Sequence, residues 1–239
     1  MSEEKAIQIN EGIYWIGFGD PNAGFSNNPY LIIEGDSVIV IDPGSRREDH
    51  FSIVKRKIES IIPIEKITHI IVHHQDPDLC ASIPLFEDII GRDNFELITT
   101  LRTALLIPYY GIYTEITSIE DGDILELDNG RELMFITAPY LHFAGSFTTY
   151  DTKVKVLFSS DIFAAFSTDW ELYANENYIE AMRIFHEPYL AHKDPILSYI
   201  NKLKDLEIDM ICPQHGSIIN KDIGKYVEAL KSFEVGTWL

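Results

Sequence analysis

Six residues whose side chains can bind a metal ion come after the ends of predicted strands in this sequence. Three of them lie within the six residues that follow the apolar run 67–72. In layered α/β folds, the loops at strand ends point their side chains into a common crevice. A single Asp or His at such a position is usually a cap or a turn residue, but six together favour a metal site. The predicted ligands are His74, Asp76, Asp78, His142, Asp161 and His215.

The predicted ligands comprise three carboxylates and three imidazoles. The alternate spacing of His74, Asp76 and Asp78 lets one extended or turning loop point all three toward a single cavity. Pro77 fixes the backbone dihedral between the two carboxylates. Oxygen ligands favour harder metals such as iron or manganese, whereas imidazole suits zinc. The carboxylate-rich set therefore favours iron or manganese.

The order of these motifs along the chain resembles that of the metallo-β-lactamase superfamily. The string His74-Gln-Asp-Pro-Asp78 is followed by His142 in PYLHFAGS, Asp161 in VLFSSDIF and His215 in CPQHGSII. The superfamily has an HxHxDH-type motif and later His, Asp and His ligands. More narrowly, the chain looks like the diiron domain of flavodiiron proteins, whose motif is HxExDH. Asn28-Pro-Tyr-Leu and the Pro-x-His-Gly string match that branch too, so the resemblance runs through essentially the whole chain.

The resemblance implies a non-haem site of two iron ions joined by an oxide, hydroxide or peroxide bridge. Two divalent cations outweigh three carboxylates in charge, so a bridging anion is electrostatically favourable. By position in the motifs, the two irons would share Asp161, one iron would be completed by His74, Asp76 and His142, and the other by Asp78 and His215.

The sequence departs from the flavodiiron pattern at two positions. Asp76 is one methylene shorter than the family Glu, and Leu79 stands where the motif has its last His, which leaves an open coordination position on the second iron. His73 is a candidate substitute ligand, but neighbouring side chains of a strand point to opposite faces and His74 is assigned inward. Asp42 either orients a ligand through a hydrogen bond or caps a hairpin.

Strand and helix patterns alternate along the chain. Asn129-Gly130 between alternating runs predicts a hairpin with a two-residue turn. The chain has two similar halves. Each half begins with a predicted hairpin that ends in Asp, at 30–42 and at 149–161, and each hairpin leads through helical sequence to a short strand. The other predicted elements are strands at 13–16, 30–33, 38–41, 67–72 and 210–212, helices at 48–62, 79–90 and 194–206, and a hairpin at 147–160.

No low-complexity stretch or Pro/Gly/Ser linker divides the sequence, which predicts one domain over residues 1–239. Two similar β-rich halves with covering helices predict an α/β fold of two packed sheets flanked by helices. The resemblance makes this the metallo-β-lactamase-like αββα four-layer sandwich, with mostly antiparallel or mixed sheets. The aromatic segment 163–178 is a candidate roof over the site, limiting water and admitting a small apolar gas. The other histidines, His50, His69, His186 and His192, are interpreted as surface or core residues.

The composition restricts partners and location. Nineteen basic residues against 38 acidic ones give a net charge of −19, which disfavours nucleic acid and anionic membranes as partners. The N-terminal sequence has no signal pattern, and no apolar run reaches the roughly 20 residues of a membrane span, so we expect a cytoplasmic protein. The two cysteines, Cys80 and Cys212, are predicted to be free, buried thiols.

The resemblance implies a reaction with O₂ or NO. Flavodiiron proteins reduce these gases with electrons from a flavodoxin-like domain, whereas this sequence shows no FMN-binding domain and no rubredoxin cysteines. We therefore expect a diiron protein that binds O₂ and acts as an oxygen or iron sensor in bacterial signalling, reporting to a partner protein. It resembles the standalone members of the family, and homodimerisation is an analogy to flavodiiron proteins.

Three alternatives stay open on the sequence alone. One is an O₂/NO reductase that receives electrons from separate flavodoxin or rubredoxin-type donors, which leaves enzymatic activity undecided. Another is a Zn-dependent hydrolase of the superfamily, acting on a thioester, lactone or phosphodiester through a metal-activated water. The third is an interaction scaffold without metal.

Overall fold

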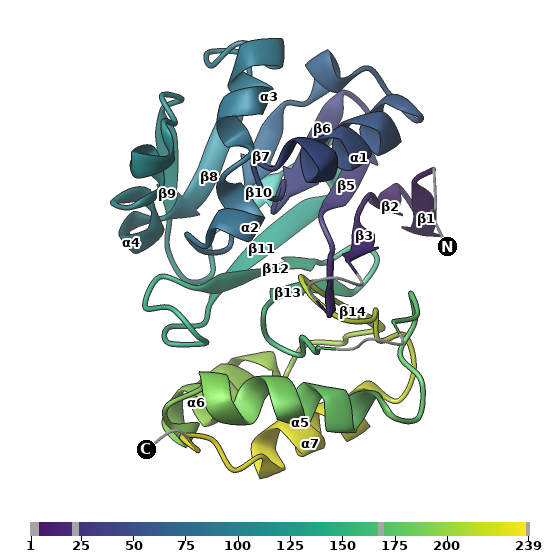
Figure 1. The fold of residues 1–239 in the computed structure, drawn as a ribbon, viewed down its shortest axis with the longest axis vertical. Helices are drawn as coiled ribbons and strands as arrows, with labels where there is room; N and C mark the ends of the chain where they lie inside the picture. The colour runs from purple at the N-terminus through teal and green to yellow at the C-terminus, as the bar shows by residue number, and fades with distance from the viewer. Residues whose placement is uncertain (1–4, 21–23, 167–169, 238–239) are drawn as a thin grey trace. The chain divides into compact units, whose positions relative to one another are not determined.

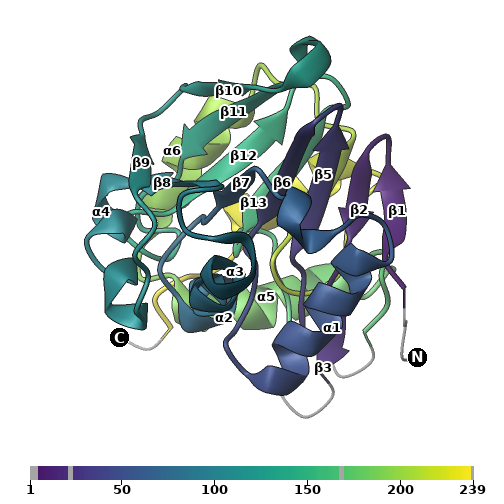
Figure 2. The same ribbon diagram turned by 90° about the horizontal axis from the view of Figure 1, so that it is seen from above.

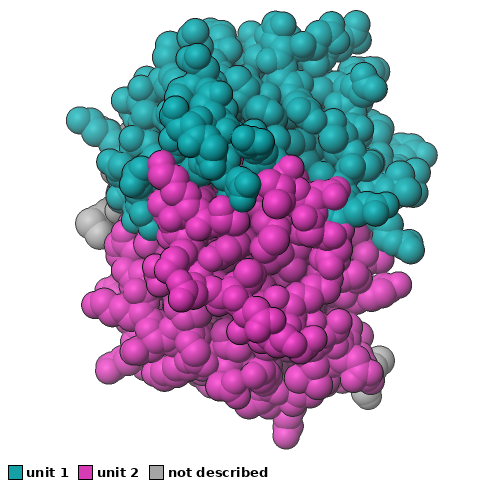
Figure 3. All heavy atoms as spheres, turned by 180° about the vertical axis from the view of Figure 1, so that it is seen from behind, with its two compact units in different colours: residues 1–18, 27–120, 125–132 teal, residues 19–26, 121–124, 133–239 magenta. Residues whose placement is uncertain are grey.

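The structure is a computed structural model that describes residues 5–20, 24–166 and 170–237. The chain forms two compact units, coloured separately in Figure 3, and each unit collects segments that are distant in sequence. The prediction of one domain over 1–239 stays a prediction. Unit 1 consists of residues 1–18, 27–120 and 125–132, and unit 2 of residues 19–26, 121–124 and 133–239.

Unit 1 contains a mixed sheet with the strand order β1-β2-β5-β6-β7-β8-β9. Its strands pair antiparallel from β1 to β6 and parallel from β6 to β9, and the register shifts only between Gln8 and Asn10 of β1 among these described pairs. The parallel strands β6 and β7 are rich in Ile and Val and largely buried, as strands covered by crossover helices are, whereas the edge strand β9 is partly exposed. The strands are Ile7–Asn10 (β1), Ile13–Trp15 (β2), Tyr30–Glu34 (β5), Ser37–Ile41 (β6), His69–Ile71 (β7), Glu96–Thr100 (β8) and Ile116–Ile119 (β9).

Two helices of unit 1, α1 (Glu48–Glu59) and α3 (Ile83–Ile90), lie along this sheet (Figure 2). They bury apolar side chains such as Ile58 and Phe86 in one cluster with strand residues. The predicted helix 79–90 is interrupted, because Pro84 has no N–H for a continuous helix and stands in the first turn of a new one. The short helical turns of unit 1 are Ile64–Lys66 (η1), Pro77–Cys80 (α2), Leu101–Ala104 (α4) and Ile107–Tyr110 (η2).

The second sheet, most of which lies in unit 2, has the order β10-β11-β12-β13-β14. Pairing is antiparallel from β11 to β13 and parallel between β13 and β14. Helices α5, α6 and α7 lie side by side in unit 2 (Figure 1) and share an apolar cluster with this sheet. The elements are Ile124–Glu126 (β10), Glu132–Thr137 (β11), Phe147–Asp151 (β12), Val156–Ser160 (β13), Met210–Pro213 (β14), Tyr178–Tyr189 (α5), Lys193–Leu203 (α6) and Ile223–Ser232 (α7); β3 (Phe18–Asp20) and β4 (Phe25–Asn27) form a separate pair.

The predicted hairpin between β10 and β11 forms, but the prediction of a two-residue turn was wrong. The chain instead turns through the 3₁₀ segment η3 (Asp128–Gly130), with Asn129 at φ 58° and Gly130 at φ 74°. The reason is a tertiary contact: the Asp128 carboxylate accepts a hydrogen bond of 2.6 Å from the backbone N–H of Asp36. That contact holds Asp128 in the turn and out of the strand.

Both cysteines are free and buried, as predicted. Burial raises the pKa of the Cys80 and Cys212 thiols, and at Cys80 the nearby carboxylates of Asp42, Asp76 and Asp78 raise the pKa further. Because the thiolate is the reactive form, we expect neither thiol of the folded protein to be alkylated by iodoacetamide at neutral pH, whereas both react in urea. Mass spectrometry measures the labelling, and rapid modification of Cys80 in folded protein would contradict this description.

Among the residues that the structure describes, no helix is long and apolar enough to cross a membrane.

Candidate metal centre

In unit 1, the loop after β7 carries the first predicted ligands. His74 is fully buried, and its Nε2 lies 3.4 Å from Oδ2 of Asp76, so both side chains can hold one ion. Asp76 is extended, at φ −64° and ψ 142°, as residues before a proline prefer. Pro77 then starts α2, which places the half-buried Asp78 in the first helical turn. Pro77 therefore separates an extended carboxylate from a helical one.

Two side chains that the sequence did not reveal position Asp76. The Gln75 amide Nε2 donates a hydrogen bond of 2.9 Å to Oδ1 of Asp76. The backbone carbonyl of Gln75 in turn accepts a hydrogen bond of 2.9 Å from the Tyr110 hydroxyl. The Gln75 bond engages one carboxylate oxygen, while the other oxygen, Oδ2, is the one closest to His74. A short Asp side chain is thus held in one orientation where the family has a longer Glu.

Asp42 holds His73 by two hydrogen bonds. Its Oδ1 accepts the backbone N–H of His73 at 2.8 Å, and its Oδ2 accepts the ring Nδ1–H at 2.6 Å. Both side chains are buried. Asp42 therefore fixes the strand end that precedes His74. The orientation of a metal ligand by Asp42 and a ligand role for His73 stay predictions.

Leu79 is fully buried in α2. Its backbone N–H donates to the carbonyl of Asp76 at 3.0 Å, and its carbonyl accepts the N–H of Gly44 at 2.9 Å. Where the family motif has its last His, this chain thus has an apolar side chain, and hydrogen bonds hold the backbone N–H and carbonyl of that residue. An open coordination position there stays a prediction.

In unit 2, Asp161 lies between two imidazoles. Nε2 of His142 donates a hydrogen bond of 2.9 Å to Oδ2 of Asp161, and Nε2 of His215 lies 3.7 Å from Oδ1. Asp161 follows β13, His142 lies between β11 and β12, and His215 follows β14, so three strand ends supply them. Asp161 and His215 are each 5% exposed. A carboxylate with one imidazole near each oxygen is suited to bridging two metal ions.

The ring of His215 is fixed in the orientation that a metal ligand requires. Its Nδ1–H donates to the backbone carbonyl of Ser26 at 2.7 Å, which leaves the lone pair of the neutral ring on Nε2, the nitrogen near Asp161. Histidine ligands of metals commonly use their second nitrogen in this way. The residue that follows must be glycine: Gly216 has φ +86°, and a Cβ there would lie 2.4 Å from Oη of Tyr178.

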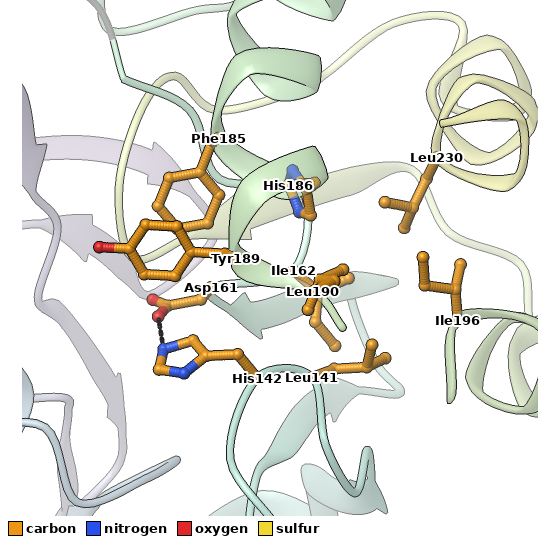
Figure 4. A pocket seen from close by; sticks show the side chains of 10 residues that line it. All are labelled: Leu141, His142, Asp161, Ile162, Phe185, His186, Tyr189, Leu190, Ile196 and Leu230. Carbon is orange, nitrogen blue, oxygen red and sulfur yellow. Dashed lines mark hydrogen bonds and ion pairs between the residues drawn. The ribbon is translucent and has the colours of Figure 1, made fainter. Parts of the chain in front are cut away.

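A pocket beside His142 and Asp161 is lined largely by apolar side chains of unit 2 (Figure 4). The predicted roof, segment 163–178, includes residues 167–169, which lie outside the described part of the chain. The aromatic wall beside the ligands instead comes from α5, where Phe185 and Tyr189 stack with ring centroids 4.9 Å apart. The i, i+4 spacing of the two aromatic residues is a sequence signal for such a wall.

His186, interpreted from the sequence as a surface or core residue, is a core residue with both ring nitrogens hydrogen-bonded. Nδ1–H donates to the carbonyl of Met182 at 2.8 Å, and Nε2 accepts the backbone N–H of Phe163 at 3.2 Å. Burial lowers the pKa of His186 to about 4, although the Met182 carbonyl acts in the opposite direction. The native ring therefore stays neutral at pH values where the unfolded chain takes up a proton.

This difference predicts a loss of stability in acid. Below pH 6.5 His186 is protonated in the unfolded state, whereas in the native state it stays neutral down to about pH 4. The free energy of unfolding therefore falls as the pH falls. We expect His186 to contribute about 2 kcal/mol of stability loss between pH 7 and pH 5. Urea unfolding of wild type and His186→Gln at both pH values measures this, since Gln keeps a donor and an acceptor but does not titrate. An identical pH dependence in the variant would refute the assignment.

Comparison with solved structures defines the class of protein first. A flavo di-iron protein of Thermotoga maritima superposes with a TM-score of 0.83 at 26% identity, over 95% of this chain and 60% of that chain. The chemotaxis sensor ODP, in a peroxy diiron state, gives a TM-score of 0.82 at 25% identity, over 97% of this chain and 96% of that chain. These matches confirm the predicted metallo-β-lactamase-like fold of flavodiiron cores.

The sequence then defines the family. The model of the ODP family of beta lactamases matches residues 25–216, and this chain belongs to that family. Among curated relatives, an uncharacterized protein of Methanocaldococcus jannaschii is 29% identical over 93% of this chain and 60% of its own length. An anaerobic nitric oxide reductase flavorubredoxin of an Enterobacter species is 25% identical over 93% of this chain and 50% of its own. The chain thus spans half to three fifths of these relatives.

The donor atoms present fit a diiron centre of the kind named for the two solved structures. Carboxylate oxygens and imidazole nitrogens lie together in each unit, at His74 with Asp76 and at Asp161 with His142 and His215. Such a mixture suits iron in a non-haem site. His74, Asp161 and His215 are buried, and burial makes a carboxylate charge such as that of Asp161 costly unless a cation balances it.

Proposed function

We propose that this chain binds two iron ions in one non-haem centre and that O₂ or NO binds there. Asp161 would hold both ions through its carboxylate, and Leu79 would supply no ligand where the motif has its last His. The remaining ligands are His74, Asp76, Asp78, His142 and His215.

The observation that carries this proposal is the geometry around Asp161. Its two oxygens lie next to two different imidazoles, and the His215 ring is held by the Ser26 carbonyl with Nε2 toward the carboxylate. This arrangement supports a bridging carboxylate more than a structural ion pair, because a structural pair would need only one histidine. Family membership and the match to a diiron sensor over 96% of that chain support the same centre.

When bound, a reduced diiron pair supplies two electrons to O₂. The protein orients the metal ligands and limits the access of water to them. Asp161 would hold both ions, Gln75 fixes the carboxylate of Asp76, and Ser26 fixes the ring of His215. The apolar side chains of α5 next to His142 limit the access of water.

We propose that the chain acts as an oxygen or iron sensor in bacterial signalling, in the cytoplasm, and reports its ligation state to a protein partner. Similarity to a chemotaxis sensor, over 96% of that chain, supports this role. A partner can read the state only if it has different affinities for the ligated and unligated forms. The acidic chain makes nucleic acid and anionic lipid unsuitable partners. A homodimer is part of the proposal by analogy with flavodiiron proteins.

A second candidate, an O₂/NO reductase, is favoured by similarity to a nitric oxide reductase flavorubredoxin and would need electrons from a flavin or rubredoxin-type donor. Anaerobic reduction followed by oxygen consumption with a reconstituted donor separates the two. The sensor predicts one optical change per oxygen exposure and slow consumption afterwards. Rapid multiple turnover would contradict a pure sensor, and ester hydrolysis with stoichiometric zinc would favour the hydrolase.

A further inference from the structure

One end of the pocket in Figure 4 is the His142–Asp161 pair, and the rest of it extends into the core of unit 2. Helices α5, α6 and α7 contribute to its walls together with the loops before His142 and after Asp161. The space open to a water-sized molecule is about 10 Å³, enough for a single small molecule. The apolar side chains that line the inner part are Leu141, Ile162, Leu190, Ile196 and Leu230.

Hydrogen bonds engage His186 and join His142 to Asp161 at the wall of this pocket. Both ring nitrogens of His186 are bonded, to the Met182 carbonyl and to the Phe163 N–H. His142 donates to the Asp161 carboxylate. A water in the inner pocket would therefore replace its hydrogen bonds with contacts to aliphatic carbon, and cavities of this kind stay dry. An apolar molecule of the same size has no such cost.

The walls are held in place by hydrogen bonds. The Phe163 backbone is fixed from both sides, because its N–H donates to His186 and its carbonyl accepts the Tyr178 hydroxyl at 2.9 Å. Both partners belong to α5, so the helix is tied to the segment that follows Asp161. Ile196 and Leu230 are fully buried and pack in the same cluster. The pocket thus exists without rearrangement of the fold.

We infer that this pocket is a dry binding site for an apolar diatomic gas, O₂ or NO, beside the metal-facing carboxylate of Asp161. The inference rests on the proposed function and adds where the gas resides before it meets the metal centre. Its chemical basis is selection by polarity and size: the site offers dispersion contacts on all inner sides and room for one small molecule. Water and charged anions lose solvation there without compensation.

Krypton is a suitable probe, because it is apolar, small and visible by its anomalous X-ray scattering. Crystals of iron-free protein under krypton pressure should show one atom among Leu190, Ile196 and Leu230. Leu230→Phe fills the space from α7 and should abolish that atom. Val227→Phe is the matched control, since Val227 lies on the same helix and packs on the same cluster without lining the pocket. It should leave the krypton atom in place.

The iron-loaded protein tests whether the pocket serves the reaction. Stopped-flow mixing of the reduced protein with O₂ should give an association rate about tenfold lower for Leu230→Phe than for wild type and Val227→Phe, at equal iron content. Ordered water in the pocket in place of krypton, or an unchanged rate in Leu230→Phe with krypton displaced, would overturn the inference. A wild-type protein that binds krypton and iron but does not react with O₂ or NO would contradict the proposed function, while the krypton result would still establish an apolar site.

Discussion

Replacing Asp161 by alanine is expected to reduce the iron content of the purified protein from two ions per chain to background. Asp161 lies between His142 and His215, with one carboxylate oxygen near each ring, and its loss would remove a ligand from both ions at once. Removing an orienting hydrogen bond alone typically costs about 10- to 100-fold in metal affinity, and removal of a shared ligand should exceed that. Iron quantification by mass spectrometry, with the optical spectrum, measures the change.

The matched control for this experiment is Asp121→Ala. Asp121 is a carboxylate of the same unit that bonds to Thr137 and Lys202 at the surface, away from the predicted ligands. This variant should keep two irons, so a fall in its iron content would indicate a general effect of losing a carboxylate. Retention of two irons by Asp161→Ala would refute the bridging role, and a scaffold without metal predicts background iron in every variant and in wild type.

Replacing Asp42 by alanine is expected to have the largest effect on stability, about 3 kcal/mol lost from the free energy of unfolding. Asp42 is 2% exposed, and its two oxygens accept the backbone N–H and the ring Nδ1–H of His73. Alanine removes both acceptors from donors that cannot reach water. It also places a residue without a polar side chain at φ 49°, a left-handed conformation that Asp and Asn tolerate better.

Asp42→Asn separates the two causes. Asn keeps one carbonyl acceptor and tolerates positive φ, so we expect it to lose less than half as much stability as alanine. Urea unfolding of the iron-free proteins measures both variants without a contribution from metal binding. Because His73 precedes His74, we also expect weaker iron binding in Asp42→Ala than in Asp42→Asn. Equal stability of all three proteins would show that the Asp42–His73 pair contributes nothing.

The strands and the strand-end positions of the candidate ligands could be predicted from the sequence, because each depends on local patterns. Alternating and β-branched runs marked β5, β6 and β13, and His or Asp at the end of a run needed no tertiary information. Asp161 and His215 were found in this way, and the structure places them together in unit 2. The family motif then gave the order of the ligands.

The sequence suggested a supporting role for Asp42, but the partners in these contacts could not be predicted, because they lie far apart in sequence. Asp42 and His73 are separated by 31 positions, and the Tyr110 hydroxyl reaches the Gln75 carbonyl across 35. No periodicity links such pairs. The turn at Asn129 illustrates the same effect, because the Asp128–Asp36 contact overrides the local preference for a two-residue turn.

The metal content of wild-type protein, purified without added metal, tests the central claim most directly. Crystals of that protein, with anomalous diffraction recorded on both sides of the iron absorption edge, should show two iron ions with the carboxylate of Asp161 bound to both. The ring of His215 should still donate through Nδ1 to the Ser26 carbonyl. A single ion, two zinc ions, or a pair of irons that Asp161 does not touch would contradict the account.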